Sequence, residues 1–148
     1  MNRKTLAYWI PTGLFCAVVG FSGFAHVSHQ PGMVEAMTHL GYPLYFMTII
    51  GTAKILGVAA VLAPVPPLLK EWAYAGLCFN LIGATASHAF SGDPLSHVVR
   101  PAIVLVLCVA SYLLRPEAQR LPASPTLGQA SRPDGTLNDP ESPAVDPG

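Results

Sequence analysis

The hydrophobic positions of this chain fall into four long runs, separated by short segments that contain proline, glycine and charged residues. The runs extend over residues 5–27, 43–63, 71–90 and 97–114. Each run is close to the ~20 residues that an α-helix needs to cross the ~30 Å hydrocarbon core of a bilayer. The pattern therefore predicts four transmembrane helices.

The segments between the runs contain residues that end helices. Proline and glycine occur at residues 31–32, three prolines fall within residues 64–67, and residues 91–94 have turn chemistry at every position. Residues 33–40 are expected to form a short amphipathic turn that lies at the membrane interface. Short links of this kind predict an all-α fold, an antiparallel four-helix bundle within the membrane.

A cleaved signal peptide is the rival interpretation of the first run, because Gly23-Phe24-Ala25 resembles a weak cleavage site. The run is longer than a typical signal-peptide core, however, and its small residues share one helical face. Small residues on one face let transmembrane helices approach closely, so we expect a retained first span. Two such stripes occur, one in the first run and one in the third: Gly13, Ala17, Gly20 and Phe24, and Ala73, Gly76, Asn80, Gly83 and Ser87.

Composition supports a membrane protein. Only 11% of the residues are charged and 51% are hydrophobic, whereas a soluble domain carries about 25% charged residues. The net charge of zero gives no reason to expect a nucleic-acid partner. Residues 117–148 are rich in Pro, Ser, Gly and Asp and contain few large apolar residues, so this segment is expected to be a disordered tail.

The basic residues near the ends of the runs predict the orientation of the chain. Cytoplasmic ends of transmembrane helices carry an excess of Lys and Arg. By the alternation of the runs, all but Arg100 fall on one side: Arg3, Lys4, Lys70, Arg115 and Arg120. We therefore expect a multi-pass membrane protein with both termini, including the tail, in the cytoplasm.

Lys54 is the leading candidate for a functional residue, because it lies near the middle of the second run. A charge at mid-membrane costs at least ~2.5–3.5 kcal/mol by insertion scales. Gly51 and Gly57 lie three residues to either side, which predicts that Lys54 points into the bundle. Asn80 of the third run is expected to be level with it and can accept a hydrogen bond, but cannot neutralise a charge.

The function of Lys54 is left open by the residues alone. The acidic residues of the bundle region, Glu35, Glu71 and Asp93, all lie at or beyond the ends of the runs. Three roles remain: a structural lysine held by polar neighbours, a ligand-binding or proton-relay group, and a side chain that extends to the interface.

Histidines form a second set of candidates. His26 and His88 lie near the ends of the first and third runs, which the assigned topology places at the outer face. Imidazoles there suit an interfacial role, contact with a quinone head group, or a metal. No H-x-x-x-H pair occurs, so no metal site is expected. Asp93 and Arg100 bracket the last outer loop and are expected to form a salt bridge.

The cysteines and the remaining motifs add little chemistry. Cys16, Cys78 and Cys108 lie inside apolar runs without a C-x-x-C pattern, which is typical of small buried side chains. No haem-attachment, flavin or nucleotide motif occurs.

Several motifs resemble the DoxX-like family of small bacterial four-span membrane proteins. They are Gly41-Tyr42-Pro43, Gly51-x-x-Lys54-x-x-Gly57, residues 70–76 (KEWAYAG), and Ser87-His88 with Gly92-Asp93. The resemblance covers residues 8–114. The family takes its name from a subunit of a thiosulfate:quinone oxidoreductase, and other relatives are linked to membrane redox systems. The resemblance therefore implies a non-catalytic or accessory subunit of the bacterial inner membrane that acts with redox-enzyme partners.

On this interpretation, Lys54, Asn80, His26 and His88 line an intramembrane pocket for a quinone. Two alternatives come from other classes of protein. One is a small proton-linked transporter in which Lys54 titrates, which would require oligomerisation, for example as a homo-oligomer. The other is a structural or assembly factor without a ligand.

Overall fold

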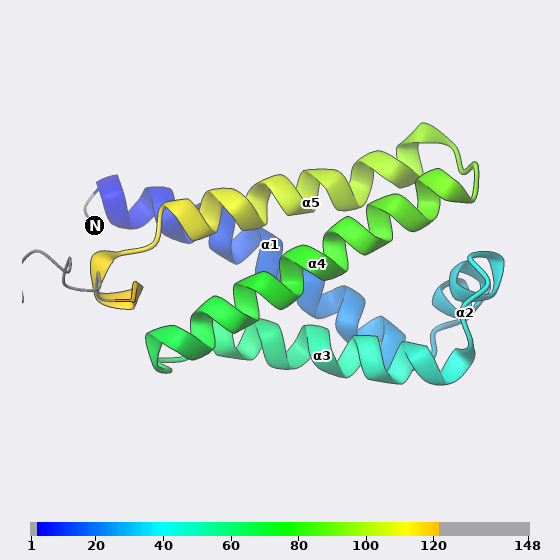
Figure 1. Cartoon of the computed structure of the whole chain (residues 1–148), viewed down its shortest axis with the longest axis horizontal. Coiled ribbons are helices and arrows are strands. Elements are labelled where there is room, and N and C mark those ends of the chain that lie inside the picture. The colour runs from blue at the N-terminus through cyan, green and yellow to red at the C-terminus, as the bar shows by residue number, and fades with distance from the viewer. Residues whose placement is uncertain (1–2, 122–148) are drawn as a thin grey trace, which may run out of the picture.

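A computed structural model describes residues 3–121 of the chain. It is all-α in this part, with no strand, and the predicted fold class is confirmed. The helices are α1 (Arg3–Val27), α2 (Pro31–His39), α3 (Leu44–Leu62), α4 (Pro67–Phe90), α5 (Leu95–Leu113) and the short 3-10 helix η1 (Glu117–Gln119) (Figure 1).

The four long helices pack so that each contacts two others. α1 and α4 each pack along both α3 and α5. They lie diagonally across the bundle and meet through core side chains, with the Phe15 and Tyr74 rings 6.0 Å apart between centroids. Consecutive long helices run in opposite directions, and α2 lies across the end where α1 finishes and α3 starts (Figure 1). The opposite end holds the α3–α4 connection, the start of α1 and the η1 helix.

Prolines define several helix ends. α4 begins at Pro67, ahead of the hydrophobic run at residue 71, because proline fits the first turn of a helix, where its missing N–H leaves no bond unmade. Proline likewise opens α2, at Pro31. The expected tail from residue 117 begins instead with η1, and its residues 122–148 lie outside the described part.

Three of the described helices are long and apolar enough to cross a membrane: Thr5–Val27, Leu44–Leu62 and Leu95–Leu113. α4, at 24 residues, is longer than each of these three ranges, but it carries Lys70, Glu71 and Asn80. Large apolar side chains cover the outside of the bundle, among them Phe21, Phe79 and Val106, which are each at least 67% exposed. An apolar exterior of this kind suits contact with lipid.

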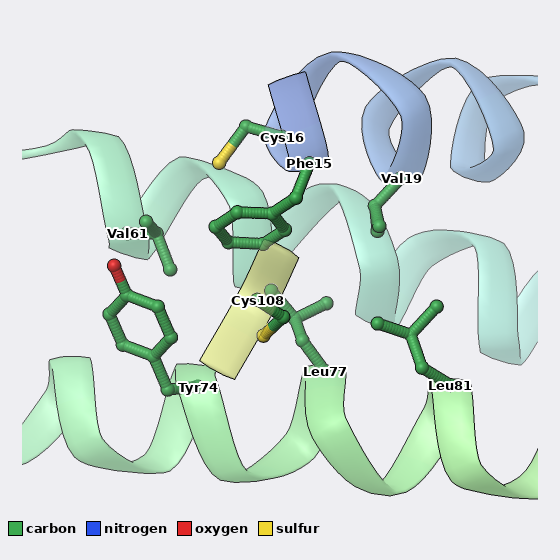
Figure 2. Close-up of a cluster of buried hydrophobic side chains, with 8 residues drawn as sticks. All are labelled: Phe15, Cys16, Val19, Val61, Tyr74, Leu77, Leu81 and Cys108. Carbon is green, nitrogen blue, oxygen red and sulfur yellow. The ribbon is translucent and has the colours of Figure 1, made fainter. Parts of the chain in front are cut away.

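The core of the bundle lies where all four long helices meet. Figure 2 shows its side chains pointing toward one another from facing helices. They are Phe15, Cys16, Val19, Val61, Tyr74, Leu77, Leu81 and Cys108. Two of the three cysteines are therefore buried core residues, and Cys78 is half-buried beside them.

Cys78 and Cys108 offer a direct test of how α4 packs against α5. Their sulfur atoms are 3.5 Å apart, and a disulfide bond is ~2.05 Å long, so the two thiols are close enough for an oxidant to test whether they can be joined. Copper-phenanthroline is expected to form this intramolecular bond, leaving Cys16 as the only thiol that maleimide labels after denaturation. Cys16→Ser should retain the crosslink and Cys108→Ser should lose it. Labelling of all three thiols after oxidation would contradict this packing.

The small-residue stripes form packing faces only in part: Gly20 approaches Val58 of α3 and Ala73 packs against the core, but the other glycines of the stripes do not meet a neighbouring helix. No side chain lies within 4 Å of where a methyl group would stand on Gly13, Gly76 or Gly83, and Phe24 is 59% exposed. The buried face of α1 instead includes Tyr8, Thr12, Phe15, Val19, Gly23 and His26. The small-residue stripe of α1 and this buried face have the same helical spacing. The face with the larger and polar side chains is the one that contacts the neighbouring helices.

The close helix contact is between Gly23 of α1 and Gly51 of α3. A methyl group on Gly51 would come within 2.8 Å of the Gly23 carbonyl oxygen and 2.9 Å of the His26 Cβ atom. Only glycine at these two positions lets the backbones approach so closely. This contact places Lys54, one turn further along α3, directly against α1.

Candidate functional site

Lys54 lies among α1, α3 and α4. It is half-buried, and its ammonium group donates a hydrogen bond to the Ser22 hydroxyl of α1 over 3.2 Å. One turn toward the other end of α3, Gly57 faces Leu77 of α4, whose Cγ would lie 3.0 Å from an added methyl group. The two glycines therefore bring a neighbouring helix to each side of the lysine.

Ser22 joins Lys54 to His26. His26 is only 8% exposed, and its Nδ1 atom lies 2.6 Å from the Ser22 carbonyl oxygen. Because a carbonyl only accepts, Nδ1 carries the proton and donates it. Ser22 was missed in the sequence, although a serine one turn before His26 in an apolar run could have indicated it.

A cleft of about 170 Å³ opens between α3 and α4 beside Lys54. Its polar members are Lys54 and Asn80, and its apolar walls include Ile50, Trp72 and Leu77. The two predicted residues thus lie on one cleft, without a direct hydrogen bond between them among the described contacts. Trp72, at the rim, is 68% exposed, so the cleft opens toward the outside of the bundle.

The salt bridges of residues 3–121 all lie away from Lys54. They join His39 to Asp93, His88 to Asp93 and Arg115 to Glu71, at the two ends of the bundle. Within this part of the chain, Lys54 has a hydroxyl and a nearby amide as polar neighbours and no carboxylate. The cleft is therefore a site with a strong hydrogen-bond donor and no fixed acceptor of opposite charge.

His88 belongs to a separate group at the end of the bundle near α2. Its Nδ1 lies 2.6 Å from one Asp93 oxygen, and Nε2 of His39 lies 2.6 Å from the other. These two donated hydrogen bonds hold the pKa of the Asp93 carboxyl below its usual value. The group links α2 to the α4–α5 turn. Of the four residues predicted to line one pocket, Lys54 and Asn80 line the cleft, and His26 and His88 do not.

The expected Asp93–Arg100 salt bridge is not formed in the described structure. The Asp93 backbone N–H bonds to the His88 carbonyl over 3.1 Å, which turns this residue back toward the last turn of α4. Arg100 is exposed on α5. The imidazole of His97 lies near His88, with ring centroids 5.8 Å apart, yet no group of three possible ligands in residues 3–121 is arranged to hold a metal ion.

Antiparallel helices with an apolar exterior, three of them long and apolar enough to cross a bilayer, define this chain as a multi-pass helical membrane protein. The sequence profile described as the DoxX-like family matches residues 10–111. The chain belongs to the DoxX-like family, as its motifs suggested.

A relative in Bacillus subtilis (strain 168), "Uncharacterized protein YdgD", is 30% identical over 94 residues. The aligned region covers 62% of this chain and 80% of that protein. A comparison with the solved structures finds no match.

Proposed function

We propose that this DoxX-like protein is an accessory subunit of a membrane redox system and that the Lys54 cleft binds the head group of a quinone. The observation that carries this proposal is a lysine with no acidic partner in residues 3–121, at the edge of an apolar cleft that also exposes an amide. The redox association that the family resemblance implies supports the same choice.

The donors of the cleft fit a neutral acceptor. The Lys54 ammonium group has three N–H donors, and Ser22 takes one of them. Asn80 offers further N–H donors on the facing helix. A quinone presents two carbonyl oxygens, carries no charge and is soluble in the membrane. A carbonyl in a dry site would receive a charge-assisted hydrogen bond, which is about twice as strong as a neutral one.

The size of the cleft limits what enters it. Its volume of about 170 Å³ is smaller than the ~300–1,000 Å³ of pockets that enclose a drug-sized ligand. A single ring fits this volume, and an isoprenoid tail would lie outside along the apolar surface beside Trp72. The proposed ligand is thus held by its head group alone.

The proposed topology has four spans with both chain ends in the cytoplasm. α4 connects α3 to α5 through short turns at opposite ends of the bundle, so it must return across the same thickness (Figure 1). Lys70, Arg115 and Arg120 lie at the end that holds the α3–α4 connection, whereas Arg100 lies near the other end, a distribution that favours this orientation.

Lys54→Met tests the quinone site. Short-chain ubiquinone and menaquinone analogues are expected to raise the melting temperature of the purified wild-type protein. Loss of a hydrogen bond from a charged donor costs about 1.5–3 kcal/mol, so Lys54→Met should weaken binding by about tenfold to a hundredfold. Differential scanning fluorimetry over a range of quinone concentrations measures both effects.

Thr52→Val is the matched control, since Thr52 is an exposed polar residue on the same helix. It should bind the analogues as the wild type does. Equal thermal shifts in Lys54→Met and wild type would contradict the proposal. Proton-coupled flux in liposomes that disappears in Lys54→Ala would favour the transporter instead.

A further inference from the structure

Two buried cations lie at the end of the bundle where α3 joins α4. Lys70 and Arg115 are each only 4% exposed. The Lys70 ammonium donates to the Val61 carbonyl in the last turn of α3 over 2.6 Å. The Arg115 guanidinium donates to Glu71 over 2.5 Å and covers the Tyr112 ring at 4.3 Å. Arg115 is near enough to Lys70 for the two positive charges to repel each other, so both cations belong to one neighbourhood.

Among the described residues, this neighbourhood has N–H donors without acceptors and a positive charge without a carboxylate to balance it. Nη1 of Arg115 is buried with no hydrogen-bond partner in residues 3–121. Lys70 has three donors, and the described contacts use one. Glu71 is the single carboxylate paired there, so one positive charge is left over. Buried charges and donors are costly unless paired, so this end of the bundle favours a bound anion.

A cavity of about 360 Å³ lies against Lys70. Gln119 of η1 and Trp9 of α1 also line it. The Gln119 carbonyl oxygen accepts from the Tyr8 hydroxyl over 3.1 Å, which leaves its amide N–H groups for a ligand. Trp9 is 44% exposed, and tryptophan is typical of the depth at which lipid head groups begin.

We infer that this cavity binds a phosphate group, with Lys70 and Gln119 as the direct donors and Arg115 as a second positive charge nearby. The phosphodiester of an anionic phospholipid such as phosphatidylglycerol has this chemistry and occurs at this depth; inorganic phosphate shares it. The site is separate from the Lys54 cleft and does not depend on the proposed quinone function.

Lys70→Gln tests the site, because it removes the charge and keeps a donor for the Val61 carbonyl. The full-length protein is delipidated and placed in nanodiscs of phosphatidylcholine, with and without phosphatidylglycerol. Native mass spectrometry should show phosphatidylglycerol retained on the wild type, and the variant should bind it about tenfold more weakly, as expected when one hydrogen bond to a charged group is lost. Arg120→Gln, an exposed cation at the same end, should bind as the wild type does.

Gln119→Leu is the second variant and leaves the contact between Lys70 and α3 intact. It should also lose about tenfold in phosphatidylglycerol affinity, so the test holds even where Lys70→Gln fails to fold. Displacement of the lipid by inorganic phosphate identifies a site for the free anion, and retention of the lipid identifies the head group. Wild-type retention of phosphatidylglycerol in Gln119→Leu, or equal loss in Arg120→Gln, overturns the inference.

Discussion

Glu71→Ala is expected to lower the free energy of unfolding by about 3–5 kcal/mol, because it leaves a buried cation without its carboxylate. The Arg115 side chain is 3% exposed and the Glu71 side chain 21%, so the arginine depends on this partner more than the glutamate does. Glu71 also accepts a hydrogen bond from the Tyr112 hydroxyl over 2.9 Å, which the substitution removes as well. Equilibrium unfolding in mixed micelles, followed by circular dichroism, measures the loss.

Two further variants identify the cause of that loss. Glu117→Ala removes an exposed carboxylate at the same end of the bundle and should change stability by less than about 0.5 kcal/mol. Glu71→Leu combined with Arg115→Met removes both charges and should recover most of the stability, since apolar pairs often replace buried ion pairs without cost. If Glu71→Ala lowered the free energy of unfolding no more than Glu117→Ala does, the buried ion pair would be contradicted.

Gly51→Ala is expected to destabilise the protein by about 1–3 kcal/mol, the usual cost of overpacking. Alanine favours a helix over glycine by about 0.8–1.0 kcal/mol, so the sign depends on the contact with α1. The obstacle is the backbone carbonyl of Gly23, 2.8 Å from the new methyl group, and it moves only if α1 moves. A displaced α1 would also lengthen the Ser22–Lys54 hydrogen bond and should weaken the proposed binding of a quinone.

Gly76→Ala is the control for helix propensity, because no side chain lies within 4 Å of the added methyl group. It should leave the protein unchanged or slightly more stable. Thermal unfolding of the two variants in the same detergent compares them directly. Equal melting temperatures would show that α1 and α3 do not approach through Gly51.

The helices were predictable from the sequence because their causes are local. Apolar runs of membrane length, ended by proline and glycine, mark the four long helices, and the short amphipathic segment marks α2. Which face of a helix packs inward is not local. The stripe through Gly13 and the face through Thr12 have the same helical period, and only the position of the neighbouring helices decides between them.

The sequence predicted those parts of the site that depend only on how far along its helix each residue lies. Lys54 and Asn80 share a cleft because each lies near the middle of its helix, and two antiparallel neighbours bring those positions level. His88 and Asp93 depend instead on where α2 lies, and His39 of α2 takes the place expected for Arg100. Ser22 shows the same limit, since its role requires the close approach of Gly23 and Gly51.

The hydrogen bond between Tyr8 and Gln119 brings the two ends of the described chain together. The bundle consequently has two unlike surfaces, one from which both ends emerge and one built only of connecting segments (Figure 1). On the proposed four-span topology, a domain fused at either end would face the same compartment, so fusion could tether an enzyme there without disturbing α2 or the Asp93 group. On the same topology, the opposite surface, which carries α2 and the Asp93 group, faces the other side of the bilayer.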